Sequence, residues 1–142
     1  MPRTFVKIIM TGLLSVLGHF ACADVVVVVS DGSPVRTLSA TQLADIYLGR
    51  LTYLSEGEAI VPIDQAEQTQ AHSDFYQHYL GRTPAQIRSH WSRLIFTGRG
   101  QPPRAVNSHA ALVEAVTRNP NAIGYMDAEA VPDGLRVVDI EF

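Results

Sequence analysis

The feature that most constrains the fold is an uninterrupted run of five valines at residues 25–29. β-Branched side chains favour extended backbone, and a run of five is too short for a buried helix. A strand that is apolar at every position is buried on both faces, as in the largely parallel sheets that helices cover. Residues 30–34, Ser-Asp-Gly-Ser-Pro, then end the strand as a turn. The run therefore predicts an α/β layer structure.

The rest of the chain alternates helix and strand signals. Helices are expected over residues 39–49, 73–80, 83–95 and 108–118, and further strands over residues 59–63, 122–126 and 135–140. Ser39, Thr83 and Ser108 are the expected N-caps, and Gly49 and Gly81 are the expected helix stops. This alternation predicts a single three-layer α/β lobe with a small, mostly parallel sheet flanked by helices.

The first 23 residues have the three parts of a secretory signal peptide. Arg3 and Lys7 make the start positive, residues 8–20 are mostly apolar, and Ala21-Cys22-Ala23 fits a small-x-small cleavage site. The apolar run is about half of the roughly 20 residues that a membrane-spanning helix needs, which weighs against a retained anchor. We therefore expect residues 1–23 to be removed on export to the periplasm, leaving residues 24–142 as one domain.

The charge and chemistry of residues 24–142 narrow the function classes. They hold nine basic residues, all arginine, against fourteen acidic ones, which disfavours nucleic acid or anionic lipid as a general partner. Removal of Cys22 leaves no cysteine, so disulfides and thiol chemistry are excluded. The sequence contains no Gly-x-Ser-x-Gly, phosphate-loop or zinc motif, and its histidines lack metal-ligand spacing. We expect neither an enzyme nor a metal or cofactor site.

Four segments of the chain are informative together. In chain order they are Leu38-Ser-x-x-Gln-Leu-x-x-Ile-Tyr-Leu-Gly49, Phe75-Tyr76, Trp91-x-x-x-x-Phe96-Thr97-Gly98 and Asn121-Ala-Ile-Gly-Tyr125. They resemble the periplasmic phosphate-binding proteins of ABC transporters. The resemblance implies the class II periplasmic binding protein fold, in which two α/β lobes hold an anion between them. Because this chain has the length of about one such lobe, the resemblance implies a short, single-lobe relative.

The family's anion-binding segment, Arg-x-x-x-Ser-Gly-Thr-x-x-x-Phe, is altered in this chain. Aligned on Phe75, the arginine, serine, glycine and threonine correspond to Gln65, Thr69, Gln70 and Ala71. A charge-assisted hydrogen bond is about twice as strong as a neutral one, so the resemblance implies a weakened anion site. Helix N-termini still attract anions, which makes Gln65, Thr69, Gln70 and Ser73 the candidate ligands there. Helix capping by Thr69 and Ser73 is the alternative.

Two further groups are candidate ligand contacts. Ser30, Asp31 and Ser33 follow the first strand, and open α/β sheets bind ligands at the carboxyl ends of their strands. A plain turn explains the same residues. Arg99 lies between two glycines and has the charge to replace the missing arginine, although a solvated loop arginine explains it as well.

Two hypotheses follow for the function. In the first, the chain is an exported, substrate-binding-like protein that binds phosphate or a similar small oxyanion for an ABC transporter permease or a membrane sensor. In the second, it is a ligand-free interaction module that binds a protein partner or associates with itself as a homodimer. The altered anion segment and the length of about one lobe motivate the second hypothesis.

Overall fold

The computed structural model describes residues 24–54 and 57–142, so the expected signal peptide lies outside the described residues. The elements, in chain order, are β1 (Val25–Ser30), β2 (Thr37–Ser39), α1 (Ala40–Tyr47), β3 (Val61–Gln65), α2 (Gln70–Phe75), a π-helical turn η1 (Tyr76–Leu80), α3 (Pro84–Phe96), β4 (Arg104–Val106), α4 (His109–Arg118), β5 (Ala122–Asp127), a 3₁₀ turn η2 (Ala128–Ala130), β6 (Leu135–Val137) and β7 (Asp139–Glu141).

The central sheet has five strands in the order β4-β3-β5-β1-β6. β3 pairs in parallel with β4 and β5, whereas β1 pairs antiparallel with both β5 and β6. Four strands therefore run in one direction and β1 runs in the other, so the predicted α/β lobe with a mostly parallel sheet is confirmed. The valine strand is buried as expected, but it is the one antiparallel member, because burial on both faces does not depend on strand direction.

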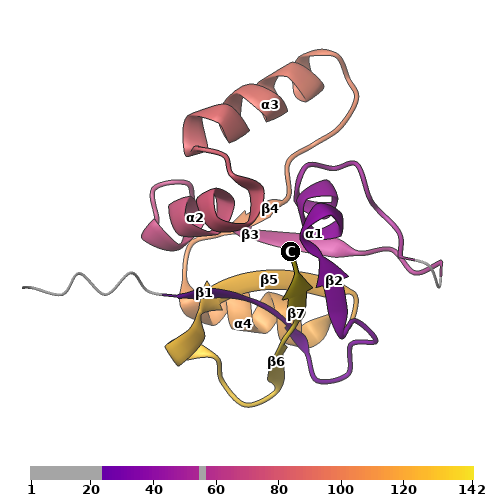
Figure 1. Ribbon diagram of the computed structural model, residues 1–142, viewed down its shortest axis with the longest axis vertical. Coiled ribbons are helices and arrows are strands. Elements are labelled where there is room, and N and C mark those ends of the chain that lie inside the picture. The colour runs from indigo at the N-terminus through magenta and orange to yellow at the C-terminus, as the bar shows by residue number, and fades with distance from the viewer. Residues whose placement is uncertain (1–23, 55–56) are drawn as a thin grey trace, which may run out of the picture.

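Helices cover both faces of this sheet, which confirms the three layers (Figure 1). On one face Val28 packs with Leu112 and Val116 of α4. On the other face Val27 and Val29 pack with the buried side chains of α1, α2 and η1, which include Leu43, Ile46, Tyr47, Phe75 and Tyr76. Because successive side chains of a strand point to opposite faces, the uninterrupted valine run supplies both cores. Figure 1 also shows α3 standing apart from these layers, above α2.

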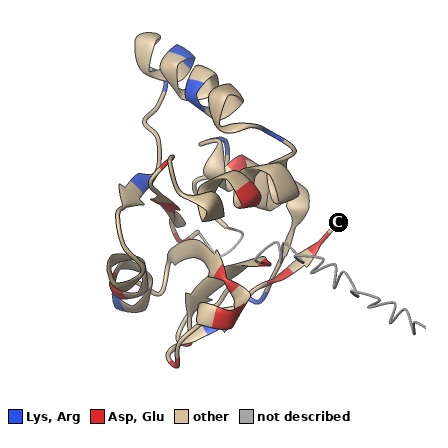
Figure 2. Cartoon of the chain, turned by 90° about the vertical axis from the view of Figure 1, so that its left-hand side faces the viewer, with Lys and Arg blue, Asp and Glu red and all other residues tan. Residues whose placement is uncertain are grey.

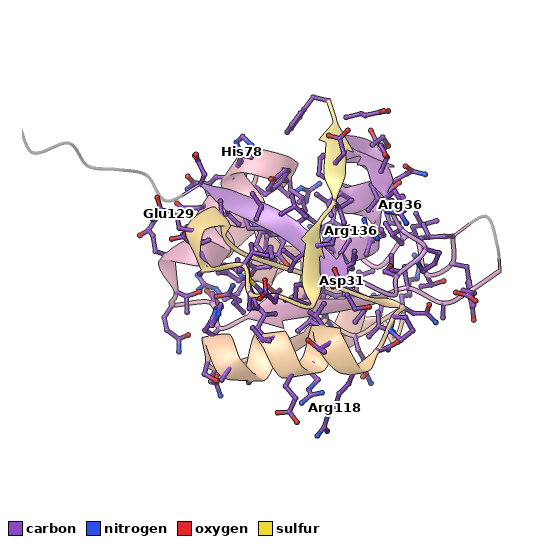
Figure 3. All side chains as sticks on the ribbon, turned by 90° about the horizontal axis from the view of Figure 1, so that it is seen from below. Asp31, Arg36, His78, Arg118, Glu129 and Arg136 are labelled. Carbon is purple, nitrogen blue, oxygen red and sulfur yellow. The ribbon has the colours of Figure 1, made fainter. Side chains whose placement is uncertain are left out.

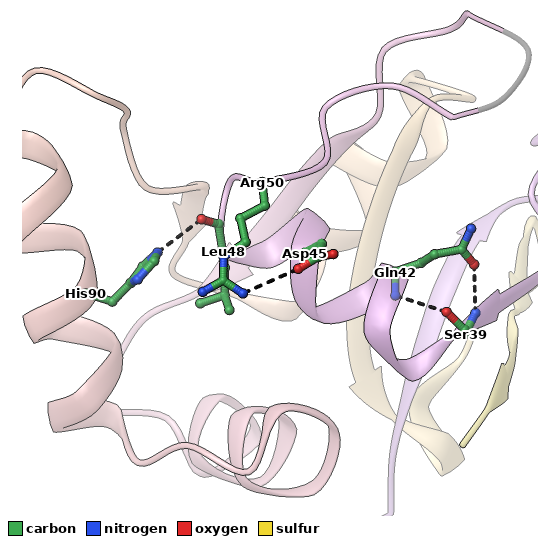
Figure 4. Close-up of polar contacts among 6 residues, drawn as sticks. All are labelled: Ser39, Gln42, Asp45, Leu48, Arg50 and His90. Carbon is green, nitrogen blue, oxygen red and sulfur yellow. Dashed lines mark hydrogen bonds and ion pairs between the residues drawn. The ribbon is translucent and has the colours of Figure 1, made fainter.

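The predicted helix caps are confirmed. Ser39 Oγ accepts the backbone N–H of Gln42 at 3.1 Å, and Gln42 Oε1 accepts the backbone N–H of Ser39 at 2.9 Å (Figure 4). Thr83 and Gln86 form the same capping box at the start of α3, and Ser108 caps α4. The second helix begins at Gln70 rather than at residue 73, because Thr69 is its N-cap.

The C-terminal segment differs from the expected strand over residues 135–140. It divides at Val138 into β6, which pairs with β1, and β7, which pairs in parallel with β2. The sequence analysis did not identify β2 or β4 as strands. Each of these strands has three residues, too few for an alternation of apolar and polar side chains to become visible.

One close packing contact joins α3 to the end of α1. His90 Nε2 lies 3.0 Å from the backbone oxygen of Leu48 (Figure 4), and Trp91 packs on Gly49. Gly49 has a φ of +74°, and a Cβ there would lie 2.8 Å from Trp91 Cη2. The glycine therefore ends α1 and also makes room for the indole. Within the described residues, no helix is long and apolar enough to span a bilayer.

We expect Gly49→Ala to destabilise the protein more than Gly98→Ala. Gly98 also follows a helix and has a positive φ of +67°, but no atom of the described residues lies within 4 Å of the position that its Cβ would take. Both variants carry the left-handed backbone cost of about 1–2 kcal/mol. Only Gly49→Ala adds overpacking, which costs about 1–3 kcal/mol more. Urea unfolding followed by circular dichroism measures the difference, and equal losses of stability would show that α3 does not pack on Gly49.

Candidate functional site

A buried carboxylate lies near the carboxyl end of β3. Asp64 is only 7% exposed. Tyr125 Oη donates to Asp64 Oδ1 at 2.5 Å, Tyr76 Oη donates to Asp64 Oδ2 at 2.7 Å, and the backbone N–H of Gln65 donates to Oδ1 at 2.8 Å. A carboxylate out of water needs such donors on both oxygens. Asp64 therefore joins β3, η1 and β5 at one point.

Aromatic packing holds the tyrosine donors in place. Phe75 stacks on Tyr125 with 3.9 Å between ring centroids and an interplanar angle of 2°. Tyr47 contacts the same rings edge-on, and its hydroxyl donates to the backbone oxygens of Ile63 and Ile123 at 3.1 and 3.2 Å. Burial, and then the negative charge of Asp64, raise the pKa of Tyr47, Tyr76 and Tyr125 far above the ordinary value of 10.0. The three phenols therefore stay protonated and remain donors.

A pocket of about 320 Å³ lies between the carboxyl end of β3 and α3. Its polar lining includes Asp64, Gln65, His72, Arg88 and Trp91. His72 and Trp91 are 4% and 6% exposed, and His72 Nδ1 and Trp91 Nε1 have no hydrogen-bond partner among the described residues. Buried polar atoms are usually paired, so two unpaired nitrogens on residues that line one pocket point to a ligand or to water.

An ion pair connects the two walls of this pocket. Arg88 of α3 pairs with Glu67, which follows β3, and both side chains line the pocket. The arginine is mostly exposed, so the pair is accessible to solvent and exchangeable. An anion that enters the pocket can compete with Glu67 for the guanidinium.

The residues of the altered anion segment lie beside this pocket, but most of their side-chain donors are already engaged. Gln65 Nε2 donates to the backbone oxygen of Tyr125 at 2.7 Å, and Gln70 Nε2 donates to Asp74 Oδ1 at 2.8 Å. Thr69 Oγ1 accepts the backbone N–H of His72 and donates to the backbone oxygen of Ala66. Ser73 is half-buried one turn further along α2. Of these four, Gln65 alone is part of the pocket lining.

The structure does not bring the other predicted residues to this site. β1 is antiparallel to β3, so the carboxyl end of β1 lies beside the amino ends of β3 and β5. There Ser30 pairs with Leu135 of β6. Ser33 Oγ accepts the backbone N–H of Val35, and the backbone N–H of Asp31 donates to the backbone oxygen of Gly134 at 3.0 Å. Figure 3 labels Asp31 in this part of the molecule. Arg99 is exposed in the loop after α3. Neither group lines the pocket.

Asp64, His72 and Trp91 were not identified as site residues from the sequence. An aspartate within the apolar stretch Ile-Val-Pro-Ile-Asp was a usable signal, since a charge in a buried strand needs partners. Trp91 lies on the buried face of α3 with Ile87. Neither residue showed that a pocket forms between α3 and β3. Among the described residues, no three histidine, aspartate or glutamate side chains are placed to hold a metal ion.

The fold matches solved phosphate-binding proteins of ABC transporters. An ABC-type phosphate transport receptor from Vibrio cholerae aligns with a TM-score of 0.64 and 18% identity over 82% of this chain. A phosphate ABC transporter substrate-binding protein from Clostridium perfringens, solved with bound phosphate, aligns with a TM-score of 0.62 and 22% identity over 82% of the chain. PstS from Borrelia burgdorferi aligns with a TM-score of 0.61 and 15% identity over 82%.

These matches confirm the predicted resemblance at the level of the fold. The chain has the fold of part of a phosphate-type substrate-binding protein. It spans less than half the length of these proteins, with 45%, 44% and 46% of each covered. No known protein family matches the sequence, and no characterised protein matches it by sequence.

The buried phenols make the folded state sensitive to alkaline pH. Their pKa is raised on folding, so they stabilise the fold fully below pH 10.0, the ordinary tyrosine value, and this stabilisation is lost as pH rises above it. Above that pH the unfolded chain releases protons that the folded chain keeps.

We expect the free energy of unfolding to fall steeply above about pH 10, and less steeply in Tyr125→Phe. Each tyrosine contributes up to about 1.4 kcal/mol per pH unit. At neutral pH the variant loses about 1–3 kcal/mol, because a buried carboxylate loses one donor. Urea unfolding between pH 7 and 11 measures both effects, and parallel pH curves for the two proteins would contradict the burial of this phenol.

Proposed function

We propose that this chain is an exported, non-enzymatic binding protein that holds a small oxyanion such as phosphate in the pocket between α3 and β3. Two buried nitrogens, His72 Nδ1 and Trp91 Nε1, carry the proposal, because they have no hydrogen-bond partner in residues 24–54 and 57–142 and belong to residues that line this pocket. An indole N–H and an imidazole N–H both donate hydrogen bonds, and an oxyanion offers only acceptors unless it is protonated. Arg88 adds a guanidinium, which suits oxyanions.

The carboxylate beside the pocket gives the proposed site a preference among anions. Asp64 repels a fully deprotonated anion, but a carboxylate has about four lone-pair sites and three are used by Tyr76, Tyr125 and Gln65. The remaining lone pair can accept a hydrogen bond from an anion that keeps a proton. Inorganic phosphate keeps at least one proton at neutral pH, because its last proton leaves only in strongly alkaline solution, whereas sulfate keeps none. The proposed order of affinity is phosphate above sulfate.

The fold supports the same proposal. The similar proteins are phosphate transport receptors and substrate-binding proteins, and one of them was solved with phosphate bound. In this proposal the chain acts in the periplasm and presents its anion to an ABC transporter permease or a membrane sensor. One wall of the proposed pocket is α3 of the same chain.

We expect phosphate to change the fluorescence of Trp91 saturably and sulfate to do so more weakly. Trp91 is the only tryptophan of the chain, so its emission reports on this pocket. Phosphate also raises the stability of the fold, by about 2.7 kcal/mol at a hundredfold excess over Kd. Fluorescence titration and thermal unfolding at constant ionic strength measure the two effects. A flat response to both anions up to millimolar concentration would contradict the proposal.

Two variants and a matched control locate the site. Arg88→Gln and His72→Gln are each expected to weaken phosphate binding about tenfold or more, since a hydrogen bond to a charged group contributes about 1.5–3 kcal/mol. Arg118→Gln also removes one exposed arginine from an ion pair, but on α4, and is expected to leave the affinity unchanged. Equal losses in all three would indicate a nonspecific effect of charge.

A further inference from the structure

Charge is strongly segregated along this chain. Residues 75–113 hold five arginines and no aspartate or glutamate, whereas residues 24–74 and 114–142 together hold four arginines and fourteen acidic residues. Figure 2 shows the consequence in space, with basic positions along the uppermost helix, α3, and acidic positions on the body below it. Charges of opposite sign that are separated in this way steer copies of the chain toward one another.

The outward face of α3 joins this positive charge to an exposed aromatic ring. Ile87 and Trp91 face the body, and helical spacing places Arg93 and Phe96 on the opposite side. Arg82 precedes the helix and lines the same surface pocket as Arg93. Phe96 is 93% exposed. Within the described part of the chain, neither arginine forms an ion pair. Arginine and phenylalanine are enriched at protein–protein interfaces, so this face, Arg82, Arg93 and Phe96, is termed the arm face.

A surface of opposite charge lies where β1 begins. Asp24 and Asp74 line an open pocket of about 520 Å³ together with Val26 and Tyr79. Phe142 is 82% exposed and stacks on Tyr79, with 6.0 Å between ring centroids, which extends the apolar floor. These five residues are termed the acidic–aromatic patch.

We propose that two copies of this chain associate, with the arm face of each docked on the acidic–aromatic patch of the other. In this arrangement Phe96 enters the pocket against Val26 and Tyr79, and the arginines pair with Asp24 and Asp74. A second copy is the occupant that the structure favours, because the chain itself carries the complementary surface.

The position of η1 allows both contacts to form in one interface. Gln77, His78 and Tyr79 of η1 line the pocket of the patch, and Leu80 at the end of η1 lines the same surface pocket as Arg82 and Arg93. η1 therefore lies between the patch and the arginines of the arm face. A two-fold axis near this turn lets each arm reach the patch of the other copy, so the assembly closes as a dimer.

A charge exchange between the two surfaces tests the proposal, using protein purified after expression of the full chain. One variant carries Arg82→Glu and Arg93→Glu, and the other carries Asp24→Arg and Asp74→Arg. Sedimentation velocity is expected to show a dimer for the unaltered protein and a dimer Kd at least tenfold higher for each variant alone. A one-to-one mixture of the variants is expected to restore the dimer, because every arm then meets a patch of opposite charge.

Matched controls separate this interface from general charge effects and from the proposed pocket. Arg50→Glu with Arg118→Glu removes as much positive charge outside the arm and is expected to leave the dimer intact. The two charge-reversal variants of the interface should keep the circular dichroism of the folded protein and the phosphate response of Trp91. The dimer proposal and the oxyanion-site proposal are therefore tested separately. Phe96→Ser should also weaken the dimer.

Ionic strength provides a test that needs no variant. Raising NaCl from about 20 to 200 mM shortens the screening length to below about 10 Å, which should raise the dimer Kd several-fold. A monomer at 100 μM protein in low salt, a dimer insensitive to both salt and charge reversal, or a mixture that fails to reassociate would each overturn the proposal.

Discussion

The fold of this chain depends on the hydrogen bonds of one buried carboxylate. Asp64 sits near the end of a strand, out of water, and receives donors from Tyr76 on η1 and Tyr125 on β5. Leaving a buried charge without its partners is strongly destabilising, so the three elements hold one another in register. The phenols donate these hydrogen bonds only while they are protonated. Burial makes a charged carboxylate unfavourable, and the same burial keeps the phenols protonated. Phe75 and Tyr47 then pack on the rings whose positions these bonds define.

This cluster also sets the place where a ligand can bind. It forms the floor of a pocket whose other wall is α3, and α3 is held over it by the packing of Trp91 on Gly49 and by the pair Arg88–Glu67. The residues aligned with a phosphate-binding segment lie beside the pocket, with their amides and hydroxyl bonded to the protein itself. In the part of the chain that the structure describes, the buried side-chain nitrogens without partners are instead on His72 and Trp91. The site proposed here therefore uses side chains other than those of the altered segment.

The position of α3 connects the two proposals. Its inner face closes the pocket, and its outer face presents arginines and an exposed phenylalanine to solvent. The chain spans less than half of the phosphate-binding proteins that share its fold. In a dimer, the arm face of each copy would be covered by the other copy, and the inner face of α3 would stay unchanged. Anion binding and self-association can thus coexist, and they are measured by different readouts.

The sequence by itself determined the features that depend on near neighbours. The valine run made a strand buried on both faces, and Ser39 and Thr83 began helices through capping boxes. Gly49 ended the helix that Ser39 begins and Gly81 ended η1, because these signals act within a few residues. Only the tertiary structure decided that β1 runs against β5, which moved Ser30 and Asp31 away from Gln65. It also brought Asp64 to Tyr125, 61 residues away in sequence, and laid α3 over β3. Such pairings depend on which apolar surfaces, far apart in the sequence, become buried against each other. No local pattern of residues determines which surfaces pair.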